Sequence, residues 1–122
     1  MCIFLNVGLG TAAKKDVGTG PGQIPTMSNF TSGPGWARFP NGTIIQRGTS
    51  ISGPLGFPTA ISLPISFTSS FTVTTSFDSA KNGVTDCPPF ATTPIGLGGF
   101  YLMSSRTGGG TGAGANWIAV GE

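Results

Sequence analysis

Carboxylates are the residues of this sequence that come closest to supporting a reaction, and there are only four of them. Asp16 lies in a glycine-rich segment and Glu122 is the last residue, which leaves Asp78 and Asp86 as the one plausible catalytic pair. Glycoside hydrolysis uses two carboxylates about 5–10 Å apart. Both aspartates, however, belong to one turn-rich segment without apolar neighbours that would raise the pKa of either. We therefore expect no enzymatic activity.

The 122 residues contain no histidine, which excludes further kinds of site. Neither a Ser-His-Asp triad nor a zinc site built from His and Cys can be assembled. A hard cation could bind only to aspartate and backbone oxygens, and no cluster in the sequence argues for one. We expect no metal and no cofactor. Cys2 and Cys87 could form one bridge, but we favour free thiols in a protein that folds in a reducing cytoplasm.

Charge is scarce: 8% of the residues are charged and the net charge is +2. Nucleic-acid binding requires a concentrated basic surface, and a membrane helix requires about 20 consecutive apolar residues. The sequence has neither, so we expect no nucleic-acid partner and no membrane insertion. Nine phenylalanines and 38% hydrophobic residues are too many for a disordered chain. These features favour a Gly/Ser/Thr-rich all-β protein.

Periodicity predicts the strands that would position any site. Across residues 66–77, Phe or Val occupies positions 67, 71, 73 and 77, and Ser or Thr occupies all of the even positions. This period of two predicts a strand with one face in the core. A second strand is expected over 43–51, after the hairpin-turn signal Pro40-Asn41-Gly42. Residues 1–35 are predicted to form an irregular stalk, and residues 36–122 a small antiparallel β-sandwich.

Two segments near the end carry large apolar residues at consecutive positions. We expect residues 95–105 and 116–120 to pair with each other across the glycine-rich stretch 107–114. Apolar side chains on both faces of a strand indicate burial on both faces. One face would meet the second sheet of the domain and the other a neighbouring subunit. A small domain with little charge and spare apolar surface is a candidate oligomer.

The order of several motifs resembles a known family. Residues 8–20 (GLGTAAKKDVGTG) and 23–30 (QIPTMSNF) resemble the repeat near the end of tailed-bacteriophage tail fibres. The remainder is similar to the C-terminal tip domain of those fibres. Its marks are Trp36, Pro40-Asn41-Gly42-Thr43-Ile44-Ile45-Gln46-Arg47-Gly48, Leu63-Pro64-Ile65-Ser66-Phe67 and Asn116-Trp117-Ile118-Ala119-Val120-Gly121. The resemblance covers nearly the whole chain, although Met1 to Leu5 do not match, so the chain is either a short separate gene product or a fragment.

This resemblance implies an intertwined homotrimer at the distal tail fibre of a virion, made in the cytoplasm of a bacterial host. It implies contacts with the upstream fibre or other tail proteins. It also implies that distal loops of the trimer bind a surface receptor, either a lipopolysaccharide glycan or an outer-membrane protein. The alternative is a purely structural trimerisation cap of the virion fibre without receptor contact.

Three loop segments are candidates for receptor binding: the charged loop 78–86, the stiff proline-containing segment 87–90 and the glycine-rich loop 106–116. Sugar recognition needs aromatic faces and fixed hydrogen-bonding groups rather than charge. The candidate residues are Asp78, Lys81, Asn82, Asp86, Phe90, Arg106 and Asn116. Each segment also has a structural reading: the charged loop as a solvated turn, Phe90 as a cap on the core, and the glycine-rich loop as a place where three chains crowd together.

A second set of residues is expected at the trimer interface or in the core. Its members are Trp36, Arg38, Arg47, Tyr101, Met103, Trp117 and Ile118. Trp117 lies inside an apolar strand, which favours packing over a sugar platform. Arg38 and Arg47 lie on or beside strands, where they would donate hydrogen bonds to carbonyl groups of a neighbouring subunit.

Overall fold

The structure is a computed structural model that describes residues 13, 15–83, 85–107 and 112–122. One 3-10 turn precedes a series of strands. In chain order the elements are η3 (Met27–Asn29), β1 (Thr31–Gly33), β2 (Trp36–Arg38), β3 (Ile44–Ile51), β4 (Thr59–Ser62), β5 (Phe71–Phe77), β6 (Phe90–Ile95), β7 (Gly99–Ser104) and β8 (Gly114–Gly121). The predicted all-β class is confirmed.

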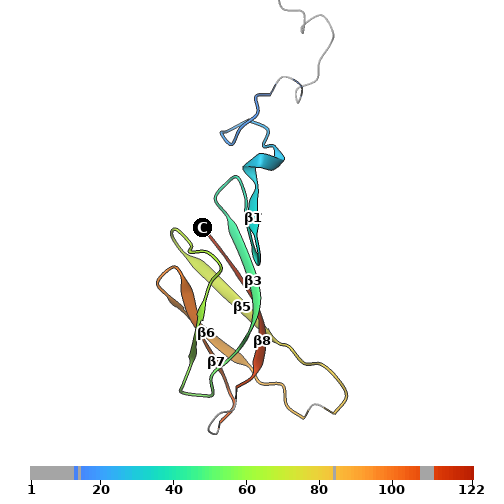
Figure 1. Cartoon of the computed structure of the whole chain (residues 1–122), viewed down its shortest axis with the longest axis vertical. Coiled ribbons are helices and arrows are strands. Elements are labelled where there is room, and N and C mark those ends of the chain that lie inside the picture. The colour runs from blue at the N-terminus through green and yellow to red at the C-terminus, as the bar shows by residue number, and fades with distance from the viewer. Residues whose placement is uncertain (1–12, 14, 84, 108–111) are drawn as a thin grey trace, which may run out of the picture.

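The strands form two antiparallel sheets that pack face to face (Figure 1). The five-stranded sheet has the order β1-β2-β3-β8-β5, and the three-stranded sheet has the order β4-β7-β6. The core between them is apolar and small. Its buried members are Ile44, Leu63, Phe67, Phe100, Leu102, Ala115, Trp117 and Ala119. This arrangement confirms the predicted antiparallel sandwich.

Phe100 and Trp117 join the two sheets at the centre of the core. Phe100 lies on β7 and Trp117 on β8, and their ring centroids are 5.2 Å apart in an edge-to-face contact. The Trp117 indole lies across Gly48 of the paired strand, where an added Cβ would come within 2.5 Å of the ring. A glycine in the middle of β3 therefore makes room for the largest buried side chain of β8.

The strand expected over 43–51 is confirmed as β3, but the one expected over 66–77 begins only at Phe71. Before it, the amides of Thr68 and Ser69 both donate to the carbonyl oxygen of Glu122 at 2.7 Å, instead of joining a ladder. Phe67 is nevertheless buried, stacked on Phe71 with centroids 4.6 Å apart. The alternating pattern thus predicted the burial correctly and the strand only in part.

The expected pairing of 95–105 with 116–120 is wrong. β7 pairs with β4 and β6 in one sheet, whereas β8 pairs with β3 and β5 in the other. The segment between β7 and β8 is a crossover from sheet to sheet and not a hairpin turn. Local sequence patterns do not distinguish the two cases, since both need only a glycine-rich connection between apolar strands.

The molecule is elongated, with its N-terminal and loop ends far apart (Figure 1). Residues 15–30 and the C-terminus lie toward one end. The described parts of the two loops, residues 78–83, 85–89, 105–107 and 112–113, lie at the other. The hairpin of β1 and β2 spans the predicted boundary between stalk and tip at residues 35 and 36, so that boundary stays a prediction. Within the described part of the chain, no helix is long and apolar enough to cross a membrane.

Candidate functional site

Two loops meet at the end of the sandwich farthest from residues 15–30 (Figure 1). Residues 78–89 connect β5 to β6, and residues 105–113 connect β7 to β8. Each connection leaves one sheet and enters the other. Both are therefore crossovers at the same end of the sandwich, the kind of place where a rigid scaffold carries binding residues.

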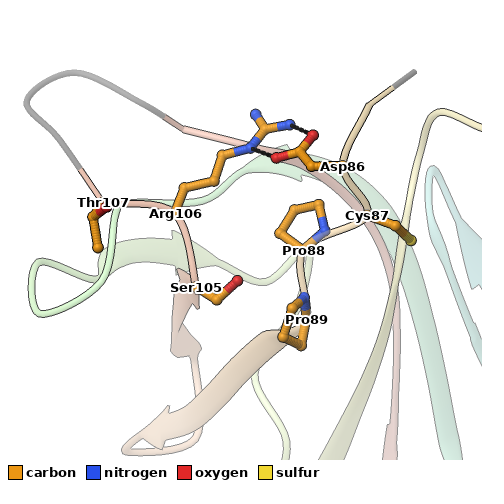
Figure 2. Close-up of a pocket in the computed structure, with 7 residues that line it drawn as sticks. All are labelled: Asp86, Cys87, Pro88, Pro89, Ser105, Arg106 and Thr107. Carbon is orange, nitrogen blue, oxygen red and sulfur yellow. Dashed lines mark hydrogen bonds and ion pairs between the residues drawn. The ribbon is translucent and has the colours of Figure 1, made fainter. Parts of the chain in front are cut away.

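Arg106 ties the two crossovers together (Figure 2). Its Nε donates to Oδ2 of Asp86 at 3.0 Å and its Nη2 to Oδ1 at 2.8 Å, so the pair is bidentate. Its Nη1 donates to the carbonyl oxygen of Gly112 at 2.8 Å, and its Cζ lies 5.5 Å from the centre of the Phe77 ring. One guanidinium thus contacts the first loop, the second loop and the end of β5.

The Arg106–Asp86 pair is also electrostatically matched. The hydrogen bonds from Arg106 lower the pKa of Asp86 below its ordinary value of 3.8, against a smaller opposing effect of desolvation. The same hydrogen bonds raise the pKa of Arg106. Both groups are charged at neutral pH. Because the Asp86 side chain is 52% exposed, salt will weaken the pair.

A cavity of about 590 Å³ opens beside this pair (Figure 2). Its lining is Asp86, Cys87, Pro88, Pro89, Ser105, Arg106 and Thr107. The two prolines have fixed φ angles, and the Pro89 carbonyl accepts a hydrogen bond from the Ser105 amide at 3.1 Å. The cavity therefore combines a stiff apolar wall with a guanidinium, a carboxylate and hydroxyl groups.

The structure brings together some of the predicted receptor-binding residues. Asp86 and Arg106 lie side by side in the cavity just described. Lys81 lines an adjoining cavity of about 390 Å³, which Asp86 also lines. Asn82 precedes Gly83, whose φ of 90° is that of a left-handed turn position. These residues share one end of the molecule.

The other three predicted residues do not line this cavity. The Asp78 amide donates to the Gly114 carbonyl, and the charge of its carboxylate contributes to the raised pKa of Arg106. Phe90 lies half-buried on β6 with its ring 6.4 Å from that of Phe77. Asn116 is on β8 and its side chain accepts a hydrogen bond from the Thr49 hydroxyl at 2.8 Å. Whether any of the seven contacts a receptor stays a prediction.

The seven predicted core or interface residues do not form one surface. Trp117 lies in the core, 4% exposed, and donates from Nε1 to the Ser50 hydroxyl. Ile118 is exposed on the opposite face of the same strand, and Tyr101 is exposed on β7 of the other sheet. Met103 is half-buried on β7. Trp36 and Arg47 line a cavity of about 270 Å³ between β1 and β3. The guanidinium of Arg38 lies 5.9 Å from the centre of the Trp36 ring.

Nothing in the sequence marks Ser105 and Thr107 as cavity-lining residues. Small hydroxyl residues are common in this sequence, so only the fold distinguishes these two. Cys87 is a free, exposed thiol, while Cys2 lies outside the described residues. No group of three or more metal-binding side chains occurs in the part of the chain that the structure describes.

Comparisons with known proteins agree with this architecture. No curated protein matches the sequence. A fragment of the P. aeruginosa R2 pyocin fibre comprising its C-terminal residues matches 76% of this chain, with 21% identity and a TM-score of 0.59. An N-truncated R2-type pyocin tail fibre matches the same share, with 22% identity and a TM-score of 0.59. At such identities the likeness shows a shared fold, and this chain spans only 25% and 36% of those two chains.

A family model supplies the sequence-level evidence that the structural likeness lacks. It describes the C-terminal region of a putative tail fibre protein, gp53-like, and it matches residues 38–122. The match begins at the last residue of β2 and includes strands β3 to β8 and both crossover loops. The resemblance inferred from the motifs is confirmed: the chain belongs to the gp53-like tail fibre C-terminal family.

Proposed function

We propose that this domain is the distal, receptor-binding end of a virion tail fibre, and that it attaches the fibre to a bacterial cell surface. In this proposal residues 15–30 lead toward the upstream fibre or other tail proteins, and the two crossover loops face the host. Membership of a tail fibre family supports the attachment role. That the domain is distal on the fibre, and that its crossover loops bind the receptor, are inferences from the geometry of the loop end.

The observation that carries the proposal is the cavity between the two crossovers. Its walls are held in place before any ligand arrives, by Arg106 on one side and by two consecutive prolines on the other. A preformed site avoids part of the entropy cost of ordering loops on binding. Hydroxyl, carboxylate and guanidinium groups beside proline faces suit a hydroxyl-rich ligand such as a lipopolysaccharide glycan. A loop of an outer-membrane protein is the other candidate receptor.

The proposal includes a homotrimer. The family resemblance supplies the number three, and exposed apolar side chains on the strands, among them Ile51, Tyr101 and Ile118, support a shared assembly. Three copies would also present three weak sites to the same cell surface, which raises the overall affinity.

We propose further that the domain binds its receptor without cleaving it. A glycosidase needs a carboxylic acid whose pKa is raised so that it can donate a proton. The hydrogen bonds from Arg106 lower the pKa of Asp86, which is the opposite of what a general acid requires. The pair with Arg106 instead suits a carboxylate that stays ionised and holds its loop in place.

The test is competition for attachment, using the purified chain and a bacterium to which the parent particle adsorbs. The unmodified chain should reduce particle adsorption. Ser105→Trp, which fills the mouth of the cavity, should abolish the competition, while Thr93→Trp on the outer face of β6 should not. Periodate treatment of the cells removes a glycan receptor and protease treatment removes a protein receptor. If neither the chain nor the loop variant affects adsorption, the structural cap without receptor contact is the better account.

A further inference from the structure

The outer face of the five-stranded sheet carries a row of uncovered aliphatic side chains. Burial alternates along β3 and β8, so that one face of each strand meets the core and the other faces outward. The outward face presents Ile45, Ile51, Ile118 and Val120, here called the aliphatic stripe. The polar pair Thr49–Asn116 lies between Ile51 and the other three. Ile51, Ile118 and Val120 are 62%, 49% and 42% exposed.

The stripe lies on strands in the interior of the sheet and not at its edge. Val120 pairs with Ile45 on one side and Thr72 on the other, and Ile118 pairs with Arg47 and Thr74. On the same face, β5 presents only the hydroxyl residues Thr72, Thr74 and Ser76. A sheet face that meets water is normally polar along all of its strands, as β5 is here. The apolar part of this face is confined to β3 and β8.

Two charged residues beside the stripe have no oppositely charged partner among the residues that the structure describes. Arg47 points outward next to Ile118, and it lines the cavity of about 270 Å³ together with Ile45. Glu122 follows β8 two positions after Val120, about 7 Å farther along the strand. Among the described residues, neither Arg47 nor Glu122 forms an ion pair; the one ion pair joins Arg106 to Asp86 at the loop end. A second copy of the chain would bring the opposite charge to each of them.

We propose that the aliphatic stripe is the contact between copies of this chain: three stripes turn toward a common axis, and Arg47 of each copy meets Glu122 of the next. This inference rests on the proposed trimer and deepens it by assigning the interface to one of the two outer faces. The outer face of the three-stranded sheet, where Tyr101 lies between Ala60 and Thr93, stays free.

The experiment is sedimentation velocity on the complete 122-residue chain. The unmodified chain should sediment with about three times the chain mass of 12.3 kDa. Ile118→Glu, which places a carboxylate in the stripe, should sediment as a single copy while keeping its β circular dichroism. The matched control is Thr93→Glu on the other outer face, which should leave the threefold mass unchanged.

A charge exchange keeps the proposal testable if Ile118→Glu fails to fold. Arg47→Glu should dissociate the assembly, and the double variant Arg47→Glu/Glu122→Arg should restore it. If the unmodified chain has the threefold mass but Ile118→Glu keeps it, or if Thr93→Glu alone dissociates it, this interface is wrong and the trimer stands. If the unmodified chain is a single copy, the trimer itself is wrong.

Discussion

Arg106 and Asp86 are 20 residues apart, yet they form the ion pair that joins the two crossover loops. The bidentate geometry needs the planar fork of a guanidinium, so lysine would keep the charge and lose the shape. The additional bond to Gly112 and the contact with Phe77 extend the effect of this side chain to three segments. At the residue scale, Arg106 is a positioning residue for the candidate site.

The lowered pKa of Asp86 predicts how the loop end responds to acid. Because the folded-state pKa lies below 3.8, the pair contributes its full stabilisation above that pH and loses it as the pH falls through the folded pKa. Carbonyl-carbon NMR titration of the Asp86 side chain should give a midpoint below 3.8 in the unmodified chain. Arg106→Ala should move it upward toward the ordinary value. An unchanged midpoint in Arg106→Ala would show that the ion pair is absent in solution.

Gln46 is a second residue whose role only the structure reveals. It is completely buried, and its side-chain amide bonds both the N–H and the C=O of Ile65, at 3.0 and 2.9 Å. We predict that Gln46→Leu destabilises the fold by about 1–3 kcal/mol, because it leaves the Ile65 groups without partners. Urea unfolding measures this, with exposed Thr93→Val as the control for an ordinary hydroxyl loss. Equal stability of the two variants would contradict the prediction.

At the scale of elements, the packing of β3 against β8 depends on Gly48. An added methyl group there would lie 2.5 Å from the Trp117 ring, whose position is fixed by Phe100 and by the bond to Ser50. We predict that Gly48→Ala costs about 1–3 kcal/mol in the free energy of unfolding. Gly98→Ala should cost less, because its methyl group meets only the Ser66 hydroxyl, 3.2 Å away. Thermal or urea unfolding of both variants checks the order.

Strand β3 was predictable because its local signals agree. Residues 43–51 follow an Asn-Gly turn, and in the structure Gly42 has a φ of 94° while the Asn41 side chain accepts from the Thr43 amide. The separate sheets of β7 and β8 were not predictable. Their partners are set by which strands lie opposite across the whole sandwich, and both strands carry similar apolar patterns.

The candidate site was predictable only as a set of loops. Composition and turn residues indicated that residues 78–90 and 106–116 are polar connections at strand ends. No pattern in the sequence indicates that Asp86 pairs with Arg106, because the spacing of exposed charged residues does not reveal which of them form ion pairs. The sequence places Asn116 both at the boundary of the glycine-rich loop and at the start of the expected strand 116–120, and the ladder with β3 and β5 places it on β8.

At the scale of the whole molecule, the two ends and the two outer faces have different characters. The loop end carries the Arg106–Asp86 pair and the large cavity, while residues 15–30 lie at the opposite end (Figure 1). One outer face presents the aliphatic stripe on β3 and β8, and the other presents Tyr101 and Ile95 among smaller residues. Under the proposed assembly through the aliphatic stripe, variants at the loop end should leave the oligomeric state unchanged.

Exchange of the crossover loops tests recognition at this end most directly. Residues 78–90 and 106–116 would be replaced together by the matching loops of a related fibre that serves a different host, and the host range of the resulting particles measured. If the cavity between these loops binds the receptor, adsorption follows the donor of the loops. Particles that assemble normally and keep the original host range would contradict the account.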